Sequence, residues 1–292
     1  NGSGTFNITD KRTGVTYDDL GYFLDNGEAG HAWMHHNPAL DKVIDSRGFP
    51  VCIAVIEDGP LVARFRIESR MRIPAGLDEN GGDSWQRLDG FGNAAKRSDE
   101  TIEMPIVTEL ELRRGDRVLR VTVAFNNPAY NHRLRMAFPT RRAGGTCHAE
   151  SAFDVVERDT EYAPGSPWFG TRGVTFPMQR FVDVSDGAAG LAVINDGLRE
   201  YEVTQDAERA ILVTLMRAYE VSLTTVSCRW EAHPEMILAQ CPGDHVFQFR
   251  VLPHAGDYTA GVLEEADRAG VPLEPAQAGD RKSTRLNSSH VS

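Results

Sequence analysis

Long hydrophobic runs are absent from this chain of 292 residues. No stretch approaches the roughly 18 consecutive apolar residues that a membrane-spanning helix requires, and no basic segment followed by an apolar one opens the sequence. Hydrophobic residues nevertheless make up 41% of the chain, which is enough for a large core. The composition therefore predicts a globular protein without a membrane partner.

Cysteine is scarce as well. Cys52, Cys147, Cys228 and Cys241 lie far apart in the sequence and form no Cys-x-x-Cys pair. Such spacing indicates neither a zinc knuckle nor a dense disulfide framework. We expect these cysteines to be reduced thiols or simply packed side chains.

An excess of positive charge is also missing. The chain has 31 Lys and Arg residues against 42 Asp and Glu residues, for a formal net charge of −11. Electrostatic capture of nucleic acid or of an anionic membrane surface needs a basic patch, and the body of the sequence has no block of basic residues. Nucleic acid is therefore not an expected partner, whereas neutral and cationic ligands stay open.

The signatures of several enzyme classes do not occur either. The sequence contains no Gly-x-Ser-x-Gly elbow, no P-loop, no His-Glu-x-x-His motif and no Gly-x-Gly-x-x-Gly run that opens a helix. These absences argue against an α/β-hydrolase, a P-loop nucleotide-binding protein, a zincin or a dinucleotide-binding fold.

A succession of short β-rich segments fills most of the chain instead. Apolar and polar residues alternate around turns such as 57–60 and 113–117, which is typical of antiparallel hairpins. Residues 260–269 are the exception and suit a short helix. The pattern predicts an all-β fold, a large antiparallel sandwich with at most short helices. The expected strands cover residues 6–8, 15–17, 51–56, 61–67, 102–112, 118–125, 133–138, 152–156, 179–184, 190–194, 201–203, 211–216 and 246–252.

The two ends of the chain lead us to expect a piece of a longer protein. The first residue is Asn1 rather than Met. The segment from Asp280 to His290 has the same sequence as the translation of a common sequencing-adapter DNA, so we expect residues 280–292 to be an artefact that forms a disordered tail. Residues 1–279 are expected to form one domain, because β-sandwiches commonly reach about 250 residues.

Residues 21–38 are rich in Gly, Asp, Asn and His, and we expect them to form a long functional loop. Its segment Asp25-Asn26-Gly27-Glu28 lies among aromatic residues. Carbohydrate sites typically contain carboxylates that accept hydrogen bonds from sugar hydroxyls, and aromatic rings that cover the apolar faces of the sugar. The alternative is a solvated turn. The aromatic residues are Tyr22, Phe23 and Trp33.

Three histidines, His31, His35 and His36, occupy the same loop. Their spacing can bring imidazoles together around a metal ion. The loop also contains Pro and Asn and implies no defined geometry, so ordinary loop polarity is the alternative.

Two arginines, Arg133 and Arg135, lie two residues apart in an expected strand. They therefore share one face of that strand, where they can pair with carboxylates. Glu200 and Glu202 alternate with apolar residues in the same way. The pattern favours a buried structural ion pair over a substrate clamp.

A series of segments in one order resembles the C-terminal β-domain of glycoside hydrolase family 38 α-mannosidases of the bacterial type. The resemblance extends from Asn1 to about residue 263, and it depends on the combination rather than on any single segment. The segments are residues 1–6, 10–11, 13–14, 25–28, 131–135, 138–140, 181–187, 190–193, 195–202, 214–217 and 253–257.

The resemblance implies a β-supersandwich of the galactose-mutarotase-like kind that follows a catalytic α/β domain absent from this chain. Enzymes of this family are retaining and zinc-dependent: a carboxylate nucleophile forms a mannosyl-enzyme, a second carboxyl acts as acid and then base, and zinc binds adjacent sugar hydroxyls. The nucleophile and the zinc ligands are expected in the missing part. We therefore assign no catalytic and no metal-binding residue here, and we expect the fragment alone to be inert.

The resemblance also implies that the loop after residue 24 approaches the mannose pocket. The family often has an acidic residue after the glycine at position 30, where this chain has a histidine, so the substrate contact and the specificity can differ. The expected substrate-binding residues are Asp25, Asn26, Glu28, His31 and Trp33.

The expected function is that of the C-terminal portion of an α-mannosidase. In this interpretation the domain packs on the catalytic domain of the same polypeptide and completes the cleft for a mannose-containing glycan or mannoside. The alternative is a stand-alone carbohydrate-binding sandwich without hydrolytic activity. A mutarotase would need a paired acid and base, and the sequence does not identify one. The bacterial character of the motifs leads us to expect a cytoplasmic protein, and homo-oligomer formation stays open.

Overall fold

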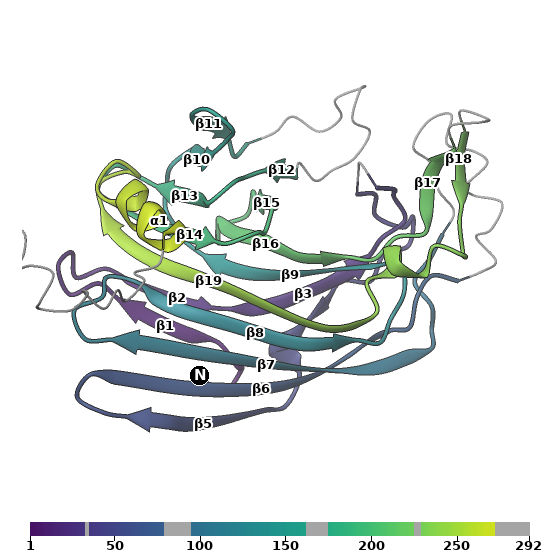
Figure 1. Cartoon of the computed structure of the whole chain (residues 1–292), viewed down its shortest axis with the longest axis horizontal. Coiled ribbons are helices and arrows are strands. Elements are labelled where there is room, and N and C mark those ends of the chain that lie inside the picture. Colours follow the sequence, from purple (N-terminus) through teal and green to yellow (C-terminus); the bar gives the residue numbers. More distant parts are fainter. Residues whose placement is uncertain (33–34, 79–94, 162–174, 225–228, 272–292) are drawn as a thin grey trace, which may run out of the picture.

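The structure of the chain, a computed structural model, describes residues 1–32, 35–78, 95–161, 175–224 and 229–271. Its strands form two large antiparallel sheets and two small hairpins (Figure 1). Across the described residues there is one α-helix, so the expected all-β sandwich with at most short helices is confirmed. The expected tail from Asp280 lies outside the described residues, and its boundary stays a prediction.

The larger sheet has nine strands in the order β11-β10-β13-β14-β19-β8-β7-β6-β5. All neighbouring strands in it are antiparallel, and β5 and β11 are its two edges. The strands are β5 (Val51–Asp58), β6 (Val62–Pro74), β7 (Thr101–Arg113), β8 (Leu119–Asn127), β10 (Thr146–Glu150), β11 (Val155–Asp159), β13 (Phe181–Ser185), β14 (Ala189–Asn195) and β19 (Gly243–Ala255).

The smaller sheet has six antiparallel strands in the order β12-β15-β16-β9-β3-β4. Its strands are β3 (Tyr22–Gly27), β4 (Ile44–Asp45), β9 (His132–Pro139), β12 (Phe176–Pro177), β15 (Glu200–Val203) and β16 (Ala210–Arg217). The hairpins are β1 (Phe6–Thr9) with β2 (Thr16–Leu20) and β17 (Val221–Thr224) with β18 (Arg229–Ala232), the 3₁₀ turns are η1 (Ser46–Gly48) and η3 (Ile237–Gln240), and the helix is α1 (Val262–Gly270).

The main core lies between the two sheets. Leu134, Met136 and Phe138 of β9 belong to it, because alternate residues of a strand share one face. Phe138 packs edge-on against Phe249 of β19 with ring centres 5.7 Å apart, so the inner faces of the sheets are in contact. Full burial of an apolar side chain of this size stabilises the fold by about 1.5–3 kcal/mol.

Helix α1 covers part of the outer face of the nine-stranded sheet, where Figure 1 shows it over β14 and β19. Val262 and Ala266 are four residues apart, so they lie on one helix face and pack on Phe181, Ile194 and Leu252 of the sheet. The helix expected over residues 260–269 is confirmed. Within the described ranges, no helix is long and apolar enough to cross a membrane.

Most expected hairpins are confirmed, including β1–β2, β5–β6 and β7–β8. The expectation that residues 21–38 form a loop throughout is wrong, because Tyr22–Gly27 form β3 and pair with β9 over six residues. Strand β10 was not expected either, because its sequence Thr-Cys-His-Ala-Glu has little apolar character. In both places, pairing with a buried neighbour outweighs a composition that favours a loop. Cys52, Cys147 and Cys241 are free thiols, as expected, and Cys228 lies outside the described residues.

A buried histidine–aspartate pair spans three strands of the larger sheet. His254 Nε2 on β19 lies 2.6 Å from Asp183 Oδ1 on β13, and both side chains are fully buried. Strand β14 runs between them, with Gly190 opposite His254. A Cβ atom at Gly190 would lie 2.5 Å from His254 Cε1. Glycine at this position therefore lets the imidazole cross β14 and reach Asp183.

We expect Gly190→Ala to lower the free energy of unfolding by about 1–3 kcal/mol, the usual range for overpacking, because the methyl group displaces the His254 ring. Urea unfolding followed by circular dichroism measures this change. Gly145→Ala is the matched control, since an added Cβ there meets no atom within 4 Å. Equal unfolding midpoints for the two variants would contradict the packing argument.

Candidate functional site at the end of strand β3

Strand β3 places neighbouring side chains on opposite faces of the six-stranded sheet. Phe23 belongs to the core between the sheets, whereas Tyr22 and Leu24 pack on the outer face. By the same alternation Asp25 points inward and Asn26 outward. These two neighbours, both expected to bind substrate, therefore belong to different clusters.

The carboxylate of Asp25 is fully buried in an ionic network. Its Oδ1 accepts a hydrogen bond from Arg97 Nη2 at 2.5 Å, and its Oδ2 lies 2.6 Å from His132 Nδ1. Arg97 Nη1 also donates to the backbone carbonyls of Asp25, at 3.2 Å, and of Lys42, at 3.0 Å. The network thus joins β3, the segment after it and the segment before β7.

His132 extends this network to the other sheet. Its Nε2 lies 2.9 Å from Oδ1 of Asn127 on β8, and Asn127 Nδ2 donates to the carbonyl of Gln240 at 2.8 Å. Both ring nitrogens of His132 are therefore within hydrogen-bond distance of a side-chain oxygen. A line of hydrogen bonds that starts at the Asp25 carboxylate connects the two sheets at this end of the sandwich.

The carboxylate of Glu28 is the centre of a second buried cluster, in the loop that follows β3. Its Oε2 accepts from Arg217 Nε at 2.8 Å and lies 2.6 Å from His35 Nδ1. Its Oε1 accepts from the backbone amides of Gly30, at 2.8 Å, and of His36, at 3.2 Å. Both oxygens of Glu28 are therefore engaged, and they tie the loop to the end of β16.

The charges in this cluster follow from burial and from these contacts. Burial alone would raise the pKa of Glu28, but the interactions with His35 and Arg217 hold it well below its ordinary value. Burial, together with His36 and Arg217, lowers the pKa of His31 to about 4. Burial also lowers the pKa of His35 and of His36. At neutral pH the cluster thus contains a carboxylate, a guanidinium and neutral imidazoles.

The outer face of the six-stranded sheet beside the loop is polar. Arg135 pairs with Glu202 at 2.8 Å, while Arg133 lies 3.7 Å from Glu200 and donates to Asn26 Oδ1 at 3.3 Å. The expected buried structural ion pair is confirmed. Burial and then Arg135 lower the pKa of Arg133 to about 10, so it stays charged at neutral pH.

The structure brings Asn26, Glu28 and His31 into one region. Asn26 Nδ2 lies 3.2 Å from Nε2 of His35, whose other ring nitrogen contacts Glu28. Arg217 Nη2 donates to the carbonyl of His31 at 2.8 Å. Asp25 faces the opposite side of the sheet, and Trp33 lies outside the described residues. Direct sugar contact by these residues stays a prediction.

Sequence reasoning gave no role to Arg97 or His132 and missed the link from Arg217 to the loop. Arg97 is separated from Asp25 by 72 positions, and Arg217 from Glu28 by 189, so no local pattern joins either pair. Arg217 belongs to the resembling segment 214–217, but the sequence around it shows only a single cation at the end of the apolar strand β16. A cation in this position is equally typical of a strand end that is exposed to solvent.

The cluster does not fit a metal ion. Within the part of the chain that the structure describes, no group of three or more His, Cys, Asp or Glu side chains could hold one. His35 Nδ1 and Glu28 Oε2 contact each other, and the remaining acceptor of Glu28 is occupied by two backbone amides. Zinc ligands are therefore not assigned to these residues.

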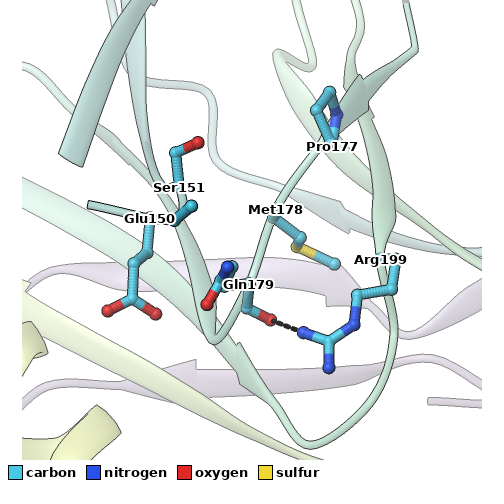
Figure 2. A pocket seen from close by; sticks show the side chains of 7 residues that line it. Glu150, Ser151, Pro177, Met178, Gln179 and Arg199 are labelled. Carbon is cyan, nitrogen blue, oxygen red and sulfur yellow. Dashed lines mark hydrogen bonds between the residues drawn. The ribbon is translucent and has the colours of Figure 1, made fainter. Parts of the chain in front are cut away.

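A separate hollow of about 300 Å³ lies beside the turn that precedes β13. Figure 2 shows that Arg199 reaches across it to the Gln179 carbonyl, at 3.3 Å. Glu150 also lines the hollow, but its carboxylate is paired with Arg180. Of the expected substrate-binding residues that the structure describes, Asp25, Asn26, Glu28 and His31, none lines this hollow.

The sequence of residues 1–220 matches the family described as the glycosyl hydrolases family 38 C-terminal domain. A protein of Halalkalibacterium halodurans named "Putative mannosylglycerate hydrolase" is 34% identical over 257 residues, which are 87% of this chain and 27% of that protein.

Two solved structures from Enterococcus faecalis have the same fold. One, described as an alpha-mannosidase of strain V583, superposes with a TM-score of 0.85 at 28% identity. The match covers 96% of this chain and 30% of that protein chain. The other, described as a protein in the glycosyl hydrolase family 38, has a TM-score of 0.82 at 28% identity and covers 96% and 32%. The chain thus spans less than a third of the length of these relatives.

We expect Asp25→Asn to lower the free energy of unfolding by about 3–5 kcal/mol, because it leaves the buried Arg97 without its counter-charge. Urea unfolding at pH 7 measures the loss. Asp99→Asn is the control, since Asp99 is exposed and its pair with Lys96 is a surface contact that contributes little. A similar small effect in both variants would show that the network does not stabilise the fold.

We expect the free energy of unfolding to decrease as the pH is lowered, in two separate pH ranges. Because the folded-state pKa of His31 is about 4 and its ordinary value is 6.5, the unfolded state binds the extra proton between these values, and acidification favours unfolding. The depressed pKa of Glu28 destabilises the fold only below its ordinary value of 4.5. His31→Gln should reduce the slope of the unfolding free energy against pH in the upper window by up to about 1.4 kcal/mol per pH unit, and Glu28→Gln should reduce it in the lower window. Unchanged slopes would refute the assignment.

Proposed function

Because this chain belongs to the C-terminal domain family of glycosyl hydrolases family 38, we propose that it is part of an α-mannosidase that hydrolyses terminal α-mannosidic bonds. The family match over residues 1–220 carries this proposal. The names of two relatives support it, since one is described as an alpha-mannosidase and the other as a mannosylglycerate hydrolase. Both names refer to the hydrolysis of a compound that carries a mannosyl group. We therefore propose a mannoside or mannose-containing glycan as the substrate.

In this proposal the enzyme is retaining, and its nucleophile lies in the part of the polypeptide that this chain does not include. A retaining glycosidase needs a carboxylate that reaches the anomeric carbon and a second carboxyl about 5–5.5 Å away. Asp25 and Glu28 are fully buried, and their oxygens are occupied by Arg97 and His132 or by Arg217 and backbone amides. We also place the zinc ligands outside this chain, since the described residues do not fit the ion.

The role of this domain in the proposal is to pack on the catalytic domain and to complete its sugar cleft. The loop after β3 is the part that we place at the cleft. Ala32 and Asn37 of this loop are exposed, and the side-chain amide of Asn37 can exchange hydrogen bonds with sugar hydroxyls. The imidazole of His31 is 6% exposed, and we place it at the wall of the cleft. Glu28 and Arg217 hold the loop in place, and Asp25 positions the strand that leads into it.

The alternative function is a carbohydrate-binding sandwich that acts alone. It requires a surface that is complete without a second domain. The exposed apolar surface of β5 to β7, described below, favours the accessory domain instead. We keep the cytoplasm as the proposed location, on the bacterial character of the motifs.

The test is hydrolysis of a chromogenic α-mannoside, with mannosylglycerate as a second substrate, by the full-length polypeptide and by this chain alone. We expect activity only in the full-length polypeptide. Activity of this chain alone would show that it has its own acid and nucleophile, and no mannoside hydrolysis by either would overturn the proposal.

For the loop, we expect His31→Ala in the full-length polypeptide to lower kcat/KM by about tenfold, a loss of about 1.4 kcal/mol in transition-state stabilisation. His148→Ala is the control, because His148 lies on β10 of the other sheet. Thermal melting of both variants separates lost contact from lost folding. Equal kcat/KM for the two variants would remove His31 from the cleft.

A further inference from the structure

Four apolar side chains at one edge of the nine-stranded sheet are strongly exposed. Ile53 is 44% exposed, Val55 60%, Phe65 42% and Leu112 50%. They come from β5, β6 and β7, the three outermost strands on that side. We call this set the β5–β7 apolar surface.

The strand register places all four residues on the same face as the core. Val55 stands opposite Phe65, which stands opposite Leu110, a residue of the main core. Ile53 stands opposite Ile67, another core residue. Residues directly opposite each other in neighbouring strands share a face. The β5–β7 apolar surface is therefore a continuation of the inner face of the sheet.

Burial along β6 and β7 shows where the core ends. On β6 the inward residues run from fully buried Met71 through Ile67 at 5% exposure to the exposed Phe65. On β7 they run from fully buried Met104 to the exposed Leu112. One end of the inner face of these strands is therefore buried, and the other end is exposed.

The opposite face of the same strands has the chemistry of a solvated surface. Arg64 of β6 pairs with Glu57 at 3.1 Å and with Glu111 at 2.6 Å, and Arg66 lies 3.7 Å from Glu109. Charged cross-strand pairs suit contact with water. Since one face carries ion pairs and the other carries Ile, Val, Phe and Leu, the apolar residues are not explained by a general tolerance for exposure.

Strand β5 makes the exposure more costly. It is an edge strand, and all but its first residue are exposed. Natural proteins protect such apolar edges, because an uncovered one pairs with other chains. An exposed apolar patch of this kind marks an interaction surface.

The remainder of the polypeptide is the occupant that the observations favour. The chain covers 27% to 32% of its relatives and matches a C-terminal domain, so most of their length precedes the matched segment. The first residues of the chain lie against this face: a Cβ at Gly4 would be 2.9 Å from Val51 Cγ1 and 3.8 Å from Ile67 Cγ2. Polypeptide that enters at residue 1 therefore arrives beside β5.

We propose that the β5–β7 apolar surface is the docking site for the polypeptide that precedes this domain in the full-length protein. Apolar residues of that polypeptide pack on the exposed ends of β6 and β7, where they extend the core, and they cover the inner face of β5. This proposal deepens the proposed accessory role, and it rests on that role only in requiring a preceding domain. It does not depend on the sugar that the full-length protein hydrolyses.

The experiment measures thiol labelling by N-ethylmaleimide in the full-length polypeptide. Native Cys52 is exposed and stands opposite Glu68, on the charged face, so it is the internal control. The double variant Cys52→Ser/Val55→Cys moves the thiol three residues along β5 to the apolar face. Trypsin releases residues 48–64 as one peptide, which contains one thiol in each protein. Each labelling rate is divided by the rate in guanidinium chloride.

We expect the thiol introduced at position 55 to be labelled at least tenfold more slowly, relative to its unfolded rate, than Cys52 in the wild-type protein. Leu112→Cys is a second, independent variant on β7, read in the tryptic peptide of residues 98–113, and should be protected to the same extent. Comparable labelling of the introduced thiols and of Cys52 would overturn the proposal. Protection that disappears on dilution would also overturn it, since the occupant is then a second copy.

Mannoside hydrolysis measured on the same samples separates this inference from the proposed function. Protection without hydrolysis of either mannoside would support the docking surface and remove the proposed activity. Hydrolysis without protection would leave the activity in place and remove the docking surface.

Discussion

The buried carboxylate of Asp25 determines the geometry of this end of the sandwich. Its two oxygens bind Arg97 and His132, and His132 in turn binds Asn127 on the other sheet. A charge inside a protein is tolerated only when it is paired and hydrogen-bonded, so each of these groups has one acceptable position. The loop after β3 begins at Glu28, three residues beyond Asp25, and its starting point is therefore set by this network.

The loop itself depends on a second buried carboxylate. Glu28 binds two backbone amides of its own loop and the side chains of His35 and Arg217. Because Arg217 ends β16, the loop is attached to a strand that is distant in sequence and close in space. The histidines around Glu28 are buried enough to be neutral at physiological pH. A loop that is held in this way can present polar groups to a sugar without reorganising, which is what a binding site on a scaffold requires.

Two surfaces of the domain have opposite character, and together they indicate an accessory domain. The outer face of the six-stranded sheet carries interleaved Arg and Glu side chains whose charges are mutually satisfied. The inner face of β5 to β7 carries apolar side chains that are 42% to 60% exposed. The first surface supports the loop that we place at the sugar cleft, and the second is suited to contact with the rest of the polypeptide. The relatives of this chain are about three times as long as the chain itself, in agreement with this division of roles.

The sequence by itself determined the fold class and most hairpins, because alternation of apolar and polar residues along a strand is a local property. The family followed from the resemblance of a series of segments in one order, which the family match confirms. The sequence also indicated, from their spacing of two, that Arg133 and Arg135 share one strand face and pair with carboxylates. It did not distinguish Asp25 from Asn26, since which face of β3 points inward is decided by the partner strand β9. Nor did it connect Glu28 with Arg217, or Asp25 with Arg97, because contacts across 189 and 72 positions arise only when the sheets close. Tertiary structure alone decided which polar residues are buried and paired, because that depends on what covers them.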